Sequence, residues 1–443
     1  MRVRFWGTRG SIPKPGPTTL RYGGNTSCVE VRAADGTLVV LDCGTGAHGL
    51  GRELMAANPS PMHGHLLIGH THWDHIQGFP FFAPLFVPDN VWEIYAPGGH
   101  GGQIEASLAG QMAYDYFPIT LKTLNAKVRL RDLTEGVFEV GSVRVTTQYL
   151  NHPALTLGYR LEADGATLVY ATDHEPHALH PLRALPGTVP VHHEDQRHIQ
   201  FLEGADLVIH DAQYTLKEFP AKEGWGHTPM ERAVDYAVLA QAQQLALFHH
   251  DPDRSDEAVD RLCARARGRA ATNGSALQVF AAAEGQAIEL PQGPTRLRPS
   301  VVPAASALLT LSPRGASTVL IVDDDPDTVQ LLEPELHAEG VRVLKATNGE
   351  SALMLARHEH PTLILLDMYL PGIDGLAVCR ILRAEPDPHL RHVPIVMLTG
   401  VKLQETDLVE AFMAGATDYL TKSVKPTLVR SRVRAWLLRT ATV

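Results

Sequence analysis

Four side chains that suit a metal ion lie within six positions of the segment GHTHWDHIQG, residues 69–78: His70, His72, Asp74 and His75. An apolar run at residues 66–68 precedes them and is typical of the end of a buried strand. Imidazole and carboxylate groups bind zinc and neighbouring divalent transition metals. A histidine-rich surface turn would seldom place these residue types at this spacing behind an apolar strand, so the segment indicates a metal site.

Four later segments repeat this arrangement, in which an apolar, strand-like run leads into histidine or aspartate. Their polar residues are His152, Asp173, the pair His210–Asp211 and the pair His249–His250. A further histidine, His227 in GWGHTP, precedes a predicted helix that has Thr228 as its expected N-cap and Pro229 in its first turn. Strands from distant parts of a chain can end at one sheet edge, so these groups are expected to share one site.

Strand-like and helix-like segments before residue 291 must position these groups. Strands are predicted at residues 1–11, in GGNTSCVEVR and in GTLVVLDCGTG, where Asp42 ends the strand. Helices are expected at 49–57 and 255–271, strands at 126–149, a hairpin ending at Asp173, and one final strand in LQVFAAAEGQAIEL. Aromatic side chains in residues 79–120 either line a pocket or fill core beside the metal loop: Phe81, Phe82, Tyr114, Tyr116 and Phe117.

Length and composition favour a globular, cytoplasmic protein. The 443 residues allow two or three domains, and 44% hydrophobic with 20% charged residues is ordinary for such chains. No apolar run reaches the roughly 18 residues of a membrane span, and the N-terminus lacks the apolar core of a signal peptide. The four cysteines form no C-x-x-C motif, so neither a disulfide framework nor a zinc knuckle is expected. A net charge of −10 disfavours a broad nucleic-acid-binding surface.

With these motifs, residues 1–290 resemble the metallo-β-lactamase-fold hydrolases, and most closely the branch of ribonuclease Z-like nucleases and cyclic-nucleotide phosphodiesterases. The resemblance implies an αββα sandwich with two divalent metals, for which zinc is expected and manganese or iron are alternatives. It assigns the ligands as follows: His70, His72 and His152 to one metal, Asp74, His75 and His249 to the other, and Asp173 to both. His249 fits the strand end better than His250, but the adjacent pair leaves both open.

The resemblance also implies roles for residues beside the metals. Asp74 and His227 are expected to take part in catalysis, His227 by neutralising the transition-state oxyanion or by protonating the leaving group. Asp42, His210 and Asp211 are candidates to orient metal ligands from behind, with a purely structural role as the alternative.

The predicted substrate is a small phosphodiester such as a cyclic nucleotide. The hairpin between His152 and Asp173 is too short for the arm with which ribonuclease Z enzymes grip transfer RNA. A nucleic-acid partner is therefore not expected. The same metal core also occurs with thioesters, lactones and iron-dependent redox chemistry, so these reactions stay open.

Residues 291–317 are rich in proline, serine, alanine and glycine and indicate a linker. Beyond them strand and helix patterns alternate five times, which predicts a doubly wound parallel sheet over residues 318–443. Such sheets bind ligands at the carboxyl ends of their strands, where this chain has acidic, hydroxyl and lysine side chains: Asp323, Asp324, Asp367, Thr399 and Lys422.

This second region resembles the flavodoxin-like (βα)5 receiver domain of two-component response regulators. The resemblance implies phosphorylation of Asp367 by a histidine kinase or phosphotransfer protein. It also implies a magnesium site formed by Asp323, Asp324, Asp367 and the Tyr369 carbonyl. The residues implied to form the switch are Thr399, Tyr419 and Lys422. Ser423 departs from the proline that usually follows the lysine, which puts the expected cis peptide in doubt.

The two resemblances together predict a single-chain signalling effector. Phosphorylation of Asp367 is expected to change access to the hydrolase site or the formation of a homodimer. No DNA-binding segment follows residue 440, so transcriptional output is not expected. The alternative is a non-enzymatic module that signals through protein contacts and keeps a vestigial metal site.

Overall fold

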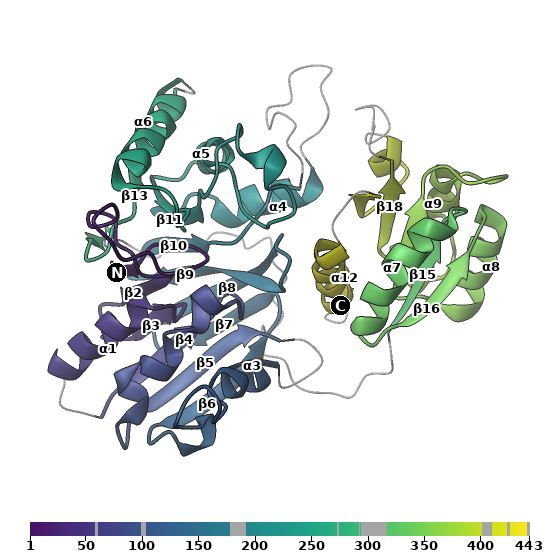
Figure 1. Cartoon of the computed structure of the whole chain (residues 1–443). Coiled ribbons are helices and arrows are strands. Elements are labelled where there is room, and N and C mark those ends of the chain that lie inside the picture. The colour runs from purple at the N-terminus through teal and green to yellow at the C-terminus, as the bar shows by residue number, and fades with distance from the viewer. Residues whose placement is uncertain are drawn as a thin grey trace. The chain divides into compact units, whose positions relative to one another are not determined.

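The computed structural model describes residues 1–57, 61–98, 103–177, 192–272, 274–291, 293, 317–400, 410–422 and 426–440. It divides into two compact units: Met1–Pro176 with Arg197–Leu311, and His177–Gln196 with Ser312–Val443 (Figure 1). Nearly all of the predicted linker lies outside the described residues, as does Ser423.

The first sheet of unit 1 has the strand order β14-β1-β2-β3-β4-β5-β6. Its strands are β1 (Arg2–Gly7), β2 (Cys28–Arg32), β3 (Leu38–Leu41), β4 (His63–Leu67), β5 (Val91–Pro97), β6 (Lys127–Leu133) and β14 (Ala287–Glu289). The strands from β3 to β6 are parallel, and the others pair antiparallel. Helix α1 (Gly46–Ala57) packs on β1 and β2, and α3 (Gln103–Gln111) packs on β6.

The second sheet has the order β13-β12-β11-β10-β9-β8-β7. Its strands are β7 (Gly136–Val140), β8 (Val143–Leu150), β9 (Thr156–Ala163), β10 (Ala166–Ala171), β11 (Leu207–Asp211), β12 (Gln244–Phe248) and β13 (Gln278–Ala281). Strands β7 to β10 are antiparallel, and β10 to β13 are parallel. The helices that follow are α4 (His193–Leu202), α5 (Met230–Leu239), which packs on β11 and β12, and α6 (Asp256–Thr272), which packs on β13.

Aromatic side chains join the two sheets face to face. The ring of Phe5 in β1 lies 6.0 Å from that of Phe248 in β12, and Tyr95 in β5 lies 5.1 Å from Phe138 in β7. With helices on the outer faces, unit 1 is the predicted αββα metallo-β-lactamase sandwich (Figure 1). Short helices complete it: α2 (Trp73–Ile76), η1 (Phe79–Phe81), η2 (Ala83–Phe86), η3 (Leu121–Thr123) and η4 (Phe219–Ala221).

Two local expectations were wrong. The segment predicted as one final strand forms two, because the chain turns at Gly285 (φ +79°) after β13 and pairs as β14 with the first sheet. Helix α5 begins at Met230 with Pro229 as its N-cap, so Thr228 does not cap it. The backbone N–H of Thr228 instead donates to Asp211 Oδ1 at 2.7 Å.

The receiver part of unit 2 is a parallel sheet of five strands in the order β16-β15-β17-β18-β19. They are β15 (Thr318–Val322), β16 (Arg342–Ala346), β17 (Leu363–Asp367), β18 (Ile395–Thr399) and β19 (Asp418–Thr421). Its helices are α7 (Pro326–Ala338), α8 (Gly349–Glu359), α9 (Gly375–Arg383), α10 (Pro388–His392) and α12 (Pro426–Thr440). Alternate residues of β17 enter apolar clusters on opposite faces, Leu365 on one and Leu366 on the other, as the predicted doubly wound fold requires.

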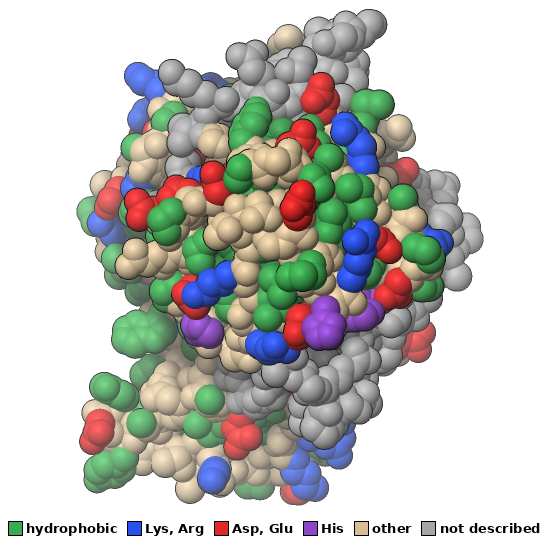
Figure 2. Space-filling model, turned by 90° about the vertical axis from the view of Figure 1, so that its right-hand side faces the viewer, with side chains coloured by type: hydrophobic (Ala, Val, Ile, Leu, Met, Phe, Trp, Pro, Cys, Tyr) green, Lys and Arg blue, Asp and Glu red, His purple; other side chains and the backbone are tan. Residues whose placement is uncertain are grey.

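Two features of the described residues concern membranes and nucleic acids. None of the described helices is long and apolar enough to span a membrane. On the face shown in Figure 2, the described lysine and arginine side chains lie among aspartate and glutamate side chains and form no large basic patch.

Candidate metal centre

Both sheets of unit 1 deliver predicted ligands to one place, at or just beyond the ends of their strands. His70 and His72 follow β4, Asp74 and His75 lie in α2, and the remaining ligands follow β8, β10 and β12: His152, Asp173 and His249. Asp173 (φ +62°) and His249 (φ +55°) both have left-handed backbones directly after their strands. Distant segments therefore converge as the strand-end pattern predicted.

The ligand atoms form two compact groups. In the first, the donor atoms of His70, His72 and His152 all lie within 4.8 Å of one another. In the second, Asp74 Oδ2 lies 3.3 Å from His75 Nε2 and 3.1 Å from His249 Nε2. His250 is not part of either group, since its Nε2 donates to the carbonyl of Ala282 at 2.9 Å.

Asp173 lies between the two groups and turns one carboxylate oxygen toward each. Its Oδ1 is 4.0 Å from His70 Nε2 and 3.9 Å from His152 Nε2. Its Oδ2 is 3.2 Å from His75 Nε2 and 3.5 Å from His249 Nε2. This is the placement expected of a carboxylate shared by two cations.

The donor set fits two divalent metals. Among the described residues, neither ring nitrogen of the buried His70 has a hydrogen-bond partner, and leaving such atoms unpaired costs free energy. Nitrogen donors with a few carboxylates suit zinc and related transition metals. The residues that would hold the metals are those of the two groups together with Asp173.

The charge states of the first ligand group and of Asp173 suit metal binding. Burial lowers the pKa of His152 to about 3 and also lowers that of His70, so both rings are neutral at pH 7. Burial acts to raise the pKa of Asp173, but His249 and His75 hold it well below its ordinary value. Neutral imidazole and ionised carboxylate are the forms that ligate metals.

Asp42, a candidate to orient a metal ligand, contacts His75 from behind. Its Oδ2 accepts hydrogen bonds from His75 Nδ1 at 2.7 Å and from the Tyr170 hydroxyl at 2.5 Å, and its Oδ1 accepts from the N–H of Gly69 at 2.7 Å. The bond to Nδ1 leaves His75 Nε2 directed at Asp74 and Asp173. Carboxylates in this position fix the tautomer and orientation of a ligating histidine.

We expect Asp42→Asn to weaken metal binding about 10- to 100-fold, the usual cost of losing such a support. The backbone of Asp42 is left-handed (φ +58°), a conformation that asparagine tolerates, so the fold should be retained. Competition with a coloured chelator measures the affinity. Tyr170→Phe is the matched control, because it removes a bond to the same oxygen but keeps the one to His75, and an equal loss in both variants would contradict this role.

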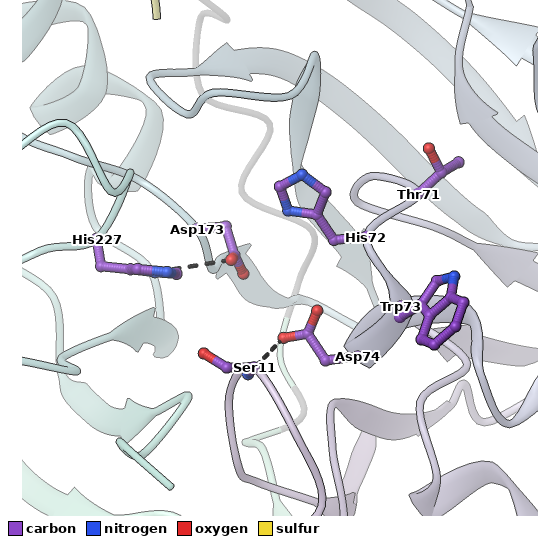
Figure 3. A pocket seen from close by; sticks show the side chains of 7 residues that line it. All are labelled: Ser11, Thr71, His72, Trp73, Asp74, Asp173 and His227. Atoms are coloured by element: carbon purple, nitrogen blue, oxygen red, sulfur yellow. Dashed lines mark hydrogen bonds and ion pairs between the residues drawn. The ribbon is translucent and has the colours of Figure 1, made fainter. Parts of the chain in front are cut away.

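A pocket of about 440 Å³ opens beside the ligands, a volume suited to a small molecule (Figure 3). Seven residues line it: Ser11, Thr71, His72, Trp73, Asp74, Asp173 and His227. The N–H of Ser11 donates to Asp74 Oδ2 at 2.7 Å. A Cβ at Gly10 would lie 2.3 Å from the ring of His249, so the glycine lets this loop approach.

His227 is held by Asp211. Its Nδ1 donates to Asp211 Oδ2 at 2.9 Å and lies 3.7 Å from Asp173 Oδ1. Burial lowers the pKa of His227 to about 4 and raises that of Asp211 to about 7. Asp211 therefore orients the predicted catalytic histidine. His210 does not reach a predicted metal ligand, since its Nε2 lies 2.9 Å from His198 Nε2.

Sequence reasoning missed three residues of the site. Glu175 accepts hydrogen bonds from the N–H groups of Gly224 and Gly226, at 2.9 and 2.7 Å, and so fixes the loop before His227. Trp73 and Ser11 line the pocket. The sequence does show a glutamate two residues after Asp173 and a glycine before Ser11. Neither of them indicates a role in the site unless the fold is known.

The predicted aromatic wall lies elsewhere. Phe82 is buried in the core of the first sheet, whereas Phe81, Tyr114 and Tyr116 are exposed. Phe117 packs edge-on against Phe81 at 5.4 Å. None of these five aromatics is among the residues that line the pocket.

The receiver also gathers its predicted groups at the strand ends. Lys422 Nζ lies 2.8 Å from Asp323 Oδ2 and 3.0 Å from Asp367 Oδ2, and the N–H of Tyr369 donates to Asp367 Oδ1 at 3.4 Å. Burial raises the pKa of Asp367 despite the bond from Lys422. The remaining predicted members are the exposed Asp324, the buried Thr399, whose hydroxyl donates to the Leu420 carbonyl at 3.2 Å, and the buried Tyr419.

Two family models match the chain. The model of the β-lactamase superfamily domain matches residues 37–250, and that of the response regulator receiver domain matches residues 319–434. The first match contains all the predicted metal ligands, and the second contains Asp367 with its surrounding acidic and lysine residues.

Individual relatives match one part of the chain each. The response regulator PleD of Caulobacter vibrioides is 39% identical over 120 residues, which are 27% of this chain and 26% of PleD. The DNA-binding response regulator MtrA of Mycolicibacterium smegmatis is 43% identical over 121 residues, 27% of this chain and 50% of MtrA. The chain thus spans a quarter to a half of these relatives. The metallo-β-lactamase fold protein YhfI from Bacillus subtilis matches 65% of this chain and 98% of its own, with 18% identity and a TM-score of 0.45.

Proposed function

Since this chain joins a β-lactamase superfamily domain to a response regulator receiver domain, we propose that it is a two-component effector whose catalytic domain hydrolyses a small phosphodiester. A cyclic nucleotide is the proposed substrate, and zinc is the proposed metal, with manganese or iron as alternatives. The receiver would hold magnesium and be phosphorylated by a histidine kinase or phosphotransfer protein.

The observation that carries this proposal is the position of Asp173, with one oxygen toward each ligand group. Two cations held there would supply an activated water and a clamp on phosphoryl oxygens. The chain's own residues set the geometry around them. Ser11 fixes Asp74, Asp42 fixes His75, and Asp211 fixes His227.

His227 is the residue we assign to the leaving group. Because its Nδ1 donates to Asp211, Nε2 is left for proton exchange with a substrate oxygen. Burial alone keeps the ring neutral at pH 7. The Asp211 carboxylate and a negatively charged substrate would both stabilise the protonated ring, which can then protonate the departing oxygen.

Two features favour a small substrate. The pocket volume of about 440 Å³ suits a ligand of nucleotide size. The β9–β10 hairpin closes directly, from Ala163 to Ala166, and carries no protruding arm for a polynucleotide.

A substrate panel tests the proposal. The full chain, loaded with zinc or manganese, is incubated with cyclic mononucleotides, cyclic dinucleotides, a thioester and a lactone. We expect release of nucleoside monophosphates from a cyclic nucleotide. Turnover of the thioester or lactone alone would overturn it, and iron absorption bands with oxygen consumption would favour redox chemistry.

Regulation is proposed to act through His177 and residues 192–196, which belong to the same compact unit as the receiver. In that unit His192 Nε2 pairs with Asp418 Oδ1 at 2.8 Å, with both side chains buried. The His192 ring also lies 4.9 Å from that of Tyr419, the predicted switch residue. In the sequence this segment starts four residues after Asp173. A rearrangement of Tyr419 on phosphorylation would therefore disturb a segment adjoining the metal centre in sequence.

We expect beryllofluoride, a phosphoryl mimic, to change the kcat of the full chain by about fivefold or more, the usual lower range of allosteric coupling. Asp367→Asn should abolish the response because this variant lacks the carboxylate to which beryllofluoride binds. His192→Gln should reduce the response without removing it. Kinetics and size-exclusion chromatography with and without the mimic measure these effects, and unchanged turnover with an unchanged oligomeric state would contradict the coupling.

A further inference from the structure

The five tryptophans of the chain differ sharply in exposure. Trp92 and Trp436 are buried in cores, and Trp6 is partly buried. Trp73 and Trp225 are 74% and 49% exposed. These two are also the tryptophans beside the site, since one directly follows His72 and the other lies two residues before His227. A large exposed aromatic ring offers a surface to a ligand, and of these two Trp73 is the one that lines the pocket.

Trp73 has a fixed backbone and an uncovered ring. It is the first residue of α2, its carbonyl accepts a hydrogen bond from Gln77 N at 2.7 Å, and predicted ligands flank it on both sides. Its indole lines the pocket, and Figure 3 shows it across Asp173 from His227. The metal loop therefore sets the position of this ring.

Trp225 is presented by a rigid loop. The glycines on either side of it donate their N–H groups to Glu175, at 2.9 and 2.7 Å. A Cβ at Gly226 would lie 2.1 Å from His152 Nδ1, so the loop packs directly behind a predicted ligand. Lys222 Nζ lies 4.2 Å from the centre of the Trp225 ring, a cation–π distance, and places a positive charge beside this ring.

We infer that the substrate carries a planar aromatic ring, in the manner of a nucleobase, and that Trp73 is its main stacking surface, with Trp225 and Lys222 offered as further contacts by the loop before His227. The inference rests on the proposed function and assigns the surface that would bind the base of its substrate. Aromatic side chains stack on any base through their faces, so the Trp73 ring would distinguish nucleotides from aliphatic phosphodiesters without selecting one particular base. It requires no basic groove, which agrees with the net charge of −10.

The test compares two substrates that differ only by the base, a cyclic nucleotide and the matching ribose cyclic phosphate. Trp73→Ala should lower kcat/KM for the nucleotide about 10- to 100-fold, mainly through KM, because one base stack is lost. The loss on the base-free ester should be much smaller. Trp73→Phe should keep most of the wild-type preference for the nucleotide over the base-free ester. Tyr114→Ala, which alters an exposed aromatic residue outside the pocket lining, should leave kcat/KM for both substrates unchanged.

Equal losses of Trp73→Ala on both substrates would overturn the inference, since the ring would then only support the metal loop. No loss on either substrate would overturn it as well. Calorimetric binding of adenosine monophosphate and ribose 5-phosphate separates this result from a failure of the proposed function. If no phosphodiester is hydrolysed, that function fails, while tighter binding of adenosine monophosphate that depends on Trp73 would still support the stacking surface.

Discussion

Replacing Asp173 with asparagine is expected to remove bound metal and to lower kcat/KM for a cyclic nucleotide about 10³-fold or more. Each oxygen of Asp173 faces one ligand group, and an amide offers only one acceptor oxygen and no charge. Metal ions stabilise such transition states by several kcal/mol, and about 1.4 kcal/mol corresponds to a factor of ten. Elemental analysis of the purified variant, together with steady-state kinetics, measures both effects.

The hairpin that leads to this residue provides a matched control. Asp164, in the turn between β9 and β10, has a similar left-handed backbone (φ +56° against +62°), and asparagine tolerates both positions. Asp164→Asn should therefore keep metal content and activity. An Asp173→Asn protein that retains two metals and normal turnover would exclude Asp173 as the shared ligand.

Replacing His227 with alanine should lower kcat about 10²- to 10⁴-fold, the usual contribution of a general acid or base. The reason differs from that for Asp173, because His227 is held by Asp211 and we assign it no metal. Metal content should therefore remain at the wild-type value. Single-turnover kinetics together with metal analysis shows whether His227→Ala loses activity alone while Asp173→Asn loses both activity and metal.

Asp211→Asn is the companion variant for His227. It keeps the shape of the residue that accepts the Nδ1 hydrogen bond but removes the negative charge that Asp211 carries above its pKa of about 7 and that would stabilise protonated His227. We expect kcat to fall less in Asp211→Asn than in His227→Ala. The fall should be smallest with a substrate whose leaving group needs no proton, such as a nitrophenyl phosphodiester. A His227→Ala enzyme that loses its metals, or that turns over at the normal rate, would contradict the assigned role.

The motifs predicted the fold of both units well because their signals are local. An apolar run followed by His70, His72, Asp74 and His75 predicts a strand end and a metal-binding loop at once. The five repeated strand–helix segments of the receiver predict its parallel sheet in the same way. A carboxylate at a strand end before a glycine-rich turn is also visible in the sequence, which made Asp42 a candidate to orient a metal ligand.

The remaining features depend on contacts between distant residues. Thr228 has the sequence pattern of a helix cap, but Asp211, 17 positions earlier, takes its N–H. In the sequence, the residues of β13 and β14 have the pattern of one continuous strand, yet each of the two strands is the edge strand of a different sheet. Glu175 acquires its role only because the loop of Gly224 and Gly226 folds back onto it. Such pairings cannot be read from local periodicity.

Metal titration of the full chain tests the central claim most directly. Metal-free protein is titrated with zinc or manganese while hydrolysis of a cyclic nucleotide is followed. The shared position of Asp173 between two ligand groups predicts that activity rises as the second equivalent binds, with two metals per chain at the maximum. Full activity with one equivalent, or no phosphodiester hydrolysis with two bound, would contradict a two-metal phosphodiesterase.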